Sequence, residues 1–128
     1  MPDGGRILVV ADYFLVAEML AEHLVRLGCE PVGPTAHVQP ALDLASREHL
    51  DGALLDIDLA GESGIPIAEA LRQRGVPIIF LSGHAEDALP PEFRNEIQLM
   101  KPVRAATLEA ALVKIGAVRA STTEMASK

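Results

Sequence analysis

The sequence predicts an α/β fold in which a doubly wound, five-stranded parallel sheet carries helices on both faces. Two observations support this prediction. Continuous apolar blocks alternate along the chain with segments of helical spacing. The alternation repeats about every 20–25 residues, near the lower limit for a compact strand–helix unit. Parallel strands need such crossover connections, and right-handed crossovers place helices on both faces of the sheet.

Three of the predicted strands are unbroken apolar blocks, at residues 7–10, 53–55 and 78–81. Because these blocks do not alternate polar with apolar residues, both of their faces should be covered. Two weaker candidates complete the sheet. Residues 30–34 contain two prolines and can form only an edge strand, whereas 97–100 reads as an edge strand with one solvated position.

Four segments between or after these strands have helical spacing, with apolar residues on one face. Gly28 and Gly75 end the first and third helices, and Pro66 stands near the start of the third. Pro90-Pro91 predicts that the fourth helix of the alternation, before the last strand, is short or irregular. The four apolar faces are Val16, Met19, Leu20, Leu24 and Leu27; Val38, Ala41, Leu42 and Ala45; Ile67, Ala70 and Leu71; and Leu108, Ala111, Leu112 and Ile115.

Composition limits the class of protein. At 128 residues and 49% hydrophobic content, the chain can bury one core, so we expect one domain over 1–119 and a flexible tail over 120–128. A net charge of −7 and 3% aromatic residues argue against nucleic-acid binding. No apolar run approaches the ~20 residues of a membrane span. With no secretory signal and a single cysteine, Cys29, the sequence predicts a cytoplasmic protein.

Polar side chains stand where the predicted strands end. Asp12 follows the first strand, Asp56 and Asp58 follow the third, and Ser82 and Lys101 follow the fourth and fifth. Ligands bind at the carboxyl ends of the strands in such sheets, so these groups should converge. Carboxylates this close repel one another unless a cation joins them, and their hard oxygen atoms select Mg²⁺. With a lysine suited to phosphate, they make up the parts needed for phosphoryl transfer.

Four segments, in this order and each at a predicted strand end, resemble the receiver domain of two-component response regulators. The resemblance runs from about Arg6 to Gly116, nearly the whole chain. It implies the flavodoxin-like strand order 2-1-3-4-5. The segments are Val9-Val10-Ala11-Asp12, Leu54-Leu55-Asp56-Ile57-Asp58-Leu59, Leu81-Ser82-Gly83-His84 and Met100-Lys101-Pro102.

The resemblance also implies a role for each matching residue. Asp56 would be the phosphoacceptor, and Mg²⁺ would be held by Asp12, Asp56 and the backbone carbonyl of Asp58. Ser82 would donate a hydrogen bond to a phosphoryl oxygen. Lys101 would pair with the phosphate, and its peptide bond to the following proline would be cis. Such a domain is not an enzyme in the usual sense, because it catalyses only its own phosphorylation and dephosphorylation.

The chain departs from the family pattern at three places. Receivers usually carry two adjacent acids after the first strand, but here Ala11 precedes Asp12, which should weaken Mg²⁺ binding. Gln98 stands where a switch aromatic is expected, three residues before Lys101, so an aromatic ring cannot report phosphorylation. Pro90-Pro91 should alter the surface that many receivers use for dimerisation or output.

The leading hypothesis is a single-domain response regulator without an output domain. It would take phosphate on Asp56 from a sensor histidine kinase or a histidine phosphotransfer protein, and then act on a downstream protein target by contact. A homodimer is compatible with the sequence but not required by it. One alternative is a degenerate receiver that binds proteins independently of phosphorylation. Another is a Mg²⁺-dependent phosphohydrolase using Asp56 and Asp58, although 128 residues leave no room for the usual cap. Asp12 could also simply cap the first helix.

Overall fold

The computed structural model of the chain describes residues 4–83 and 89–118. The predicted tail over 120–128 and His84 lie outside these residues. Five parallel strands form one sheet in the order β2-β1-β3-β6-β7, which confirms the predicted order. The strands are β1 (Arg6–Val10), β2 (Glu30–Thr35), β3 (Gly52–Asp56), β6 (Ile78–Ser82) and β7 (Ile97–Met100).

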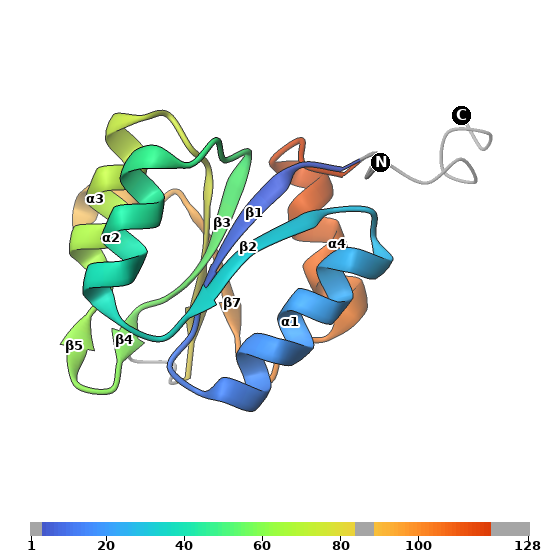
Figure 1. Cartoon of the computed structure of the whole chain (residues 1–128), viewed down its shortest axis with the longest axis horizontal. Helices are drawn as coiled ribbons and strands as arrows, with labels where there is room; N and C mark the ends of the chain where they lie inside the picture. Colours follow the sequence, from blue (N-terminus) through green and yellow to red (C-terminus); the bar gives the residue numbers. More distant parts are fainter. Residues whose placement is uncertain (1–3, 84–88, 119–128) are drawn as a thin grey trace.

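Four helices cover the two faces of this sheet, as predicted (Figure 1). Helices α1 (Phe14–Arg26) and α4 (Ala105–Lys114) lie on one face, and α2 (Val38–Arg47) and α3 (Ile65–Gln73) lie on the other. The proline-containing strand β2 is at the sheet edge, where its missing backbone donors cost no ladder hydrogen bond. Within the described ranges, no helix has the length and apolar character needed to cross a membrane.

The alternation of side chains along each strand explains the continuous apolar blocks. In β1, Leu8 and Val10 point into the core under α2 and α3, whereas Ile7 and Val9 point into the core under α1 and α4. All four side chains are fully buried. Because both faces of the sheet are covered, every position of a central strand must be apolar. The strand ends are therefore the first positions where polar groups can stand.

The structure differs from the sequence-based prediction at the first helix and agrees with it before the last strand, where Pro90-Pro91 predicted a short or irregular helix. Met19 was assigned to the buried face of α1 but is 39% exposed. The fourth helix of the alternation is reduced, in the described residues 89–96, to a 3-10 turn at Pro91–Phe93. Phe93 is fully buried there, with its ring 5.6 Å from that of Phe80 in an edge-to-face arrangement. Phe93 therefore packs against β6 from this short turn.

A short hairpin that the sequence analysis missed follows β3. Strands β4 (Asp58–Leu59) and β5 (Glu62–Ser63) pair antiparallel and lie at the lower left of Figure 1. The two turn residues, Ala60 and Gly61, both have positive φ, of 55° and 93°, as a type I′ turn requires. The Asp58 Oδ1 atom accepts a hydrogen bond from the Gly61 N–H at 3.1 Å. Strands of two residues are too short to produce a periodic sequence pattern.

Candidate functional site at the carboxyl ends of the strands

The register of the sheet brings four of the five singled-out residues to one edge. Asp56 is the last residue of the central strand β3 and pairs with Leu81, the neighbour of Ser82 in β6. Ser82 in turn pairs with Met100, which precedes Lys101. On the other side of β3, Val10 is the last residue of β1 and pairs with Leu55. Asp12 therefore lies just beyond the level of Asp56, at the same edge of the sheet. Asp12 and Lys101 therefore meet Asp56 at the strand ends, although they lie 44 and 45 positions from it in the sequence.

Asp56 is the centre of this group. Its side chain is only 1% exposed, although it carries a carboxylate. The Oδ2 atom accepts a hydrogen bond from the Asp12 backbone N–H at 2.9 Å. The Oδ1 atom lies 2.9 Å from the Lys101 Nζ atom, and the same Nζ is 3.9 Å from Asp12 Oδ1. One ammonium group thus stands between two carboxylates that would otherwise repel each other.

Burial is the main influence on the ionisation of Asp56. It raises the pKa of the Asp56 carboxyl above its ordinary value, because the charged form loses its hydration. The Asp12 N–H and the Lys101 ammonium act in the opposite direction, and the Asp12 carboxyl adds a smaller rise. The net direction is upward, so holding a charge at this position costs the folded protein free energy.

The residues at the strand ends fit a Mg²⁺ ion. Asp56 Oδ1 is buried and faces the Lys101 Nζ atom at 2.9 Å, with which it forms an ion pair. Together with Asp12 Oδ1 it forms a pair of hard oxygen donors. No cluster of three or more His, Cys, Asp or Glu side chains occurs among residues 4–83 and 89–118. Mg²⁺ commonly binds one or two carboxylates and keeps several waters, so two are sufficient.

Asp58 and Ser82 differ in their relation to this group. Asp58 is exposed, and its Oδ1 atom accepts a hydrogen bond from the Gly61 N–H within the hairpin. Ser82 is 1% exposed, and its carbonyl accepts the Lys101 N–H at 2.8 Å, which links the end of β6 to the lysine. The peptide bond between Lys101 and Pro102 is cis, as the resemblance implied.

The alternative in which Asp12 caps the first helix is wrong. The N-cap position of α1 is Tyr13, and no side chain caps this end of the helix. Asp12 instead contributes its backbone N–H and its carboxylate to the group around Asp56. A capping role requires a side-chain oxygen at the N-cap position, whereas Asp12 lies one residue before it.

Sequence reasoning missed two features of this edge. Tyr13, Phe14 and Leu15 follow Asp12 directly and are 59%, 70% and 64% exposed, although the chain has only 3% aromatic residues. These three consecutive apolar residues do not belong to the apolar face of the first helix, and this pattern in the sequence could have indicated an exposed apolar surface. Gly64, eight positions after Asp56, is buried against the end of β3. A single glycine in a loop carries no comparable signal in one sequence.

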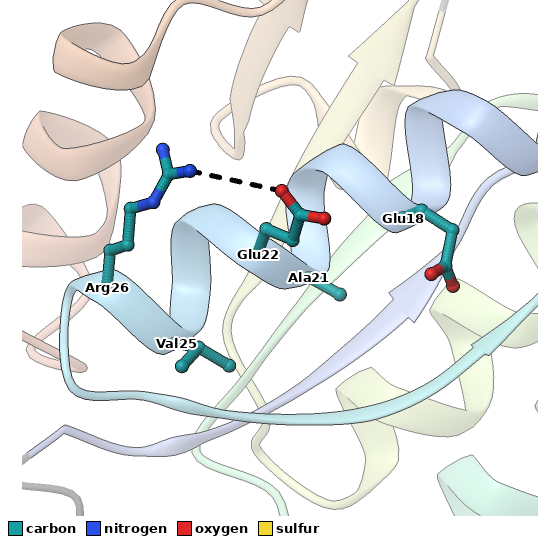
Figure 2. A pocket seen from close by; sticks show the side chains of 5 residues that line it. All are labelled: Glu18, Ala21, Glu22, Val25 and Arg26. Carbon is teal, nitrogen blue, oxygen red and sulfur yellow. Dashed lines mark ion pairs between the residues drawn. The ribbon is translucent and has the colours of Figure 1, made fainter.

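A surface hollow on α1 is separate from the strand-end group. It measures about 340 Å³ and is lined only by side chains of this one helix, as Figure 2 shows. Glu22 and Arg26 form an exposed ion pair at 3.9 Å across it, of the kind that contributes little free energy. None of the residues at the strand ends lines it, so we assign it no part in the chemistry.

The comparisons with known proteins agree on one protein family. The family model described as the response regulator receiver domain matches residues 7–113. The positive alginate biosynthesis regulatory protein of Pseudomonas aeruginosa is 35% identical over 113 residues, which cover 84% of this chain and 46% of that protein. The chain spans less than half the length of the curated relatives it matches.

Solved structures agree with this family. The solution structure of SdrG from Sphingomonas melonis Fr1 has 35% sequence identity and a TM-score of 0.79, covering 90% of this chain and 98% of that one. The receiver domain of the sensor histidine kinase PA1611 from Pseudomonas aeruginosa PAO1 has 27% identity and a TM-score of 0.73, covering 88% and 98%. That crystal structure has a magnesium ion coordinated in its active site cleft.

Proposed function

Since the chain belongs to the response regulator receiver domain family of two-component systems, we propose that it accepts a phosphoryl group on Asp56 in a Mg²⁺-dependent reaction. Receiver domains are signalling domains rather than classical enzymes, and they interact with histidine kinases and downstream targets. The observation that carries the proposal is the buried Asp56 carboxylate at the end of the central strand, whose Oδ1 atom lies 2.9 Å from the Lys101 ammonium nitrogen.

Each residue of the strand-end group has a part in the proposed reaction. An Asp56 oxygen forms a bond to phosphorus while the bond from phosphorus to the donor histidine nitrogen breaks, and the electron pair stays on that nitrogen. The Lys101 ammonium, already 2.9 Å from Asp56 Oδ1, pairs with the negative charge that arrives. Ser82, buried at the adjacent strand end, donates a hydrogen bond to a phosphoryl oxygen.

Magnesium would be held by the carboxylates of Asp12 and Asp56 and by the backbone carbonyl of Asp58. When bound, Mg²⁺ neutralises charge on the phosphoryl oxygens. The bound ion in the PA1611 receiver domain supports the same cofactor here. The sequence-based prediction of a cytoplasmic location belongs to this proposal.

Phosphate uptake tests the proposed function directly. Incubated with a small acyl phosphate and Mg²⁺, the wild-type chain should gain one phosphoryl group, measured by intact mass. Omitting Mg²⁺ or adding EDTA should remove the gain, because the two carboxylates then repel the incoming phosphate. A known receiver domain serves as the positive control. If that control is labelled and this chain is not, the proposed function is wrong.

A degenerate receiver that binds proteins without phosphorylation is the second candidate. The buried Ala11 favours it, because a methyl group stands where receivers usually place a second acid. The phosphohydrolase alternative needs the Asp58 carboxylate as an acid, whereas the Asp58 Oδ1 atom accepts a hydrogen bond within the hairpin.

The apolar triplet Tyr13, Phe14 and Leu15 supports a protein as phosphate donor. These side chains are more than half exposed and directly follow Asp12. A macromolecule that presents a phosphohistidine to Asp56 must cover the start of α1, whereas a small acyl phosphate need not. Exposed aromatic residues of this kind supply a large share of binding energy at protein interfaces.

Replacing Phe14 with alanine should therefore separate the two donors. With a phosphorylated histidine phosphotransfer domain that labels the wild type, Phe14→Ala should lower the second-order rate of transfer about fivefold or more, as expected for loss of about 1 kcal/mol at an interface. Labelling by the small acyl phosphate should not change. Val25→Ala, which truncates a 61% exposed side chain near the other end of α1, is the matched control. Equal rates for Phe14→Ala and Val25→Ala would contradict the assignment of this surface.

A further inference from the structure

The chain leaves Asp56, passes through the β4–β5 hairpin and returns to Asp56 at Gly64. Gly64 is buried and is the N-cap residue of α3, directly before the first helical residue. Its N–H donates a hydrogen bond to the Ile57 carbonyl at 2.9 Å, which closes the loop. The Ser63 Oγ atom accepts the Ile65 N–H at 3.0 Å on the helical side. The start of α3 is thereby held against the last residue of β3.

Gly64 is required there for space. A Cβ atom at this position would overlap the Asp56 backbone carbonyl oxygen, and it would also lie 3.4 Å from the Ile57 carbonyl oxygen and the Leu55 Cδ1 atom. Its φ of −81° and ψ of −4° are open to any residue, so conformation does not explain the glycine. Gly61 in the same loop is the opposite case, because its φ is +93° and no heavy atom lies within 4 Å of its Cβ position.

The backbone of Asp56 needs this support because the sheet holds it on one side only. The pairing of β3 with β1 ends at Leu55, whereas the pairing with β6 continues to Asp56. The next residue, Ile57, is also held from the β6 side, through its N–H to the Leu81 carbonyl at 3.1 Å. Gly64, at the start of α3, lies so close to this backbone that an added Cβ atom would overlap the Asp56 carbonyl oxygen.

We propose that Gly64 is a positioning residue for the phosphoacceptor. Because it lacks a side chain, α3 can begin in direct contact with the Asp56 carbonyl, and this contact sets the direction in which the Asp56 carboxylate leaves the strand. The carboxylate can then meet the Asp12 N–H and the Lys101 ammonium at 2.9 Å each. A methyl group at Gly64 would push the Asp56 backbone away and lengthen both contacts.

The Gly64→Ala variant tests this proposal, with Gly52→Ala as the matched control. Gly52 is buried at the other end of the same strand, and its added Cβ would press on the flexible ends of the Ile115 and Ile7 side chains at 2.7 and 3.2 Å. Both variants should lose thermal stability. Only Gly64→Ala should shift the backbone amide NMR resonance of Asp12, which reports the hydrogen bond to Asp56 Oδ2, and weaken Mg²⁺ binding about threefold or more, a cost of the size of one weakened hydrogen bond.

Two outcomes would overturn the proposal: an Asp12 amide unchanged in Gly64→Ala, or an equal shift in Gly52→Ala. If Gly64→Ala does not fold, a glycine inserted between Ser63 and Gly64 replaces it, since this frees α3 from the Asp56 carbonyl without adding a Cβ. The same shift is then expected, and its absence is equally decisive. Only the Mg²⁺ measurement rests on the proposed function. A wild type that binds no Mg²⁺ and gains no phosphate defeats that function, whereas the Asp12 amide still tests Gly64.

Discussion

The Asp56→Asn variant is expected to gain no phosphoryl group under conditions in which the wild type gains one. An amide oxygen is a much poorer nucleophile than a carboxylate and cannot form a stable acyl phosphate. The replacement keeps the size of the side chain, and its oxygen can still accept the hydrogen bond that Asp12 N–H donates at 2.9 Å. Intact mass after incubation with a small acyl phosphate and Mg²⁺ measures the effect.

Asp58→Asn is the matched control for this loss. It makes the same chemical change two residues away, at an exposed side chain that bonds within the hairpin, and leaves the backbone carbonyl in place. Labelling of Asp58→Asn should stay near the wild-type level. If Asp56→Asn is labelled as strongly as the wild type, the acceptor lies elsewhere and the assignment of Asp56 is wrong.

The same Asp56→Asn variant should be more stable than the wild type in metal-free buffer. Burial raises the folded-state pKa of Asp56, so the ionised form destabilises the fold. This cost is absent below the ordinary Asp pKa of about 4, appears as the pH rises through it, and is complete above the raised folded-state pKa. The gain in melting temperature from Asp56→Asn should therefore be larger near neutral pH than in acid. A gain that shrinks as the pH rises would contradict the buried-charge account.

The Asp12→Ala variant is expected to weaken Mg²⁺ binding at least about tenfold, which is about 1.4 kcal/mol. The site has two carboxylates, because Ala11 already stands in place of the acid that receivers usually carry there. In the proposed site, removing Asp12 would leave the ion with Asp56 and one backbone carbonyl, so that its charge would be poorly balanced. Calorimetric titration of the metal-free protein measures the affinity.

Glu18→Ala controls for the change in net charge. Glu18 is an exposed acid on α1, close in sequence to Asp12 but not part of the strand-end group. The Mg²⁺ affinity of the Glu18→Ala variant should equal that of the wild type. Equal affinities for Asp12→Ala and the wild type would remove Asp12 from the metal site. A wild type with no measurable binding at millimolar Mg²⁺ would favour the degenerate receiver over the phosphorylated one.

The sequence pattern predicted the strands and helices correctly where burial determines which residue types an element can carry. The central strands are apolar at every position because α1 and α4 cover one face and α2 and α3 cover the other. The sequence-based prediction was wrong or incomplete where local contacts determine the structure. Met19 lies on the edge of the apolar face of α1, so periodicity alone could not tell that it is 39% exposed. The β4–β5 hairpin depends on two positive φ angles and one Asp58 hydrogen bond, which leave no periodic pattern.

The amino-acid sequence alone determined which chemical groups stand at the carboxyl edge of the sheet. Parallel strands end at a common edge, so an acid or lysine that follows an apolar block has its place set by one-dimensional order. Only the tertiary structure decided how the two Asp56 oxygens divide between the Asp12 N–H and Lys101, and that Gly64 must lack a side chain. These features are distances between segments far apart in the chain, and such distances depend on how side chains pack when the helices close onto the sheet.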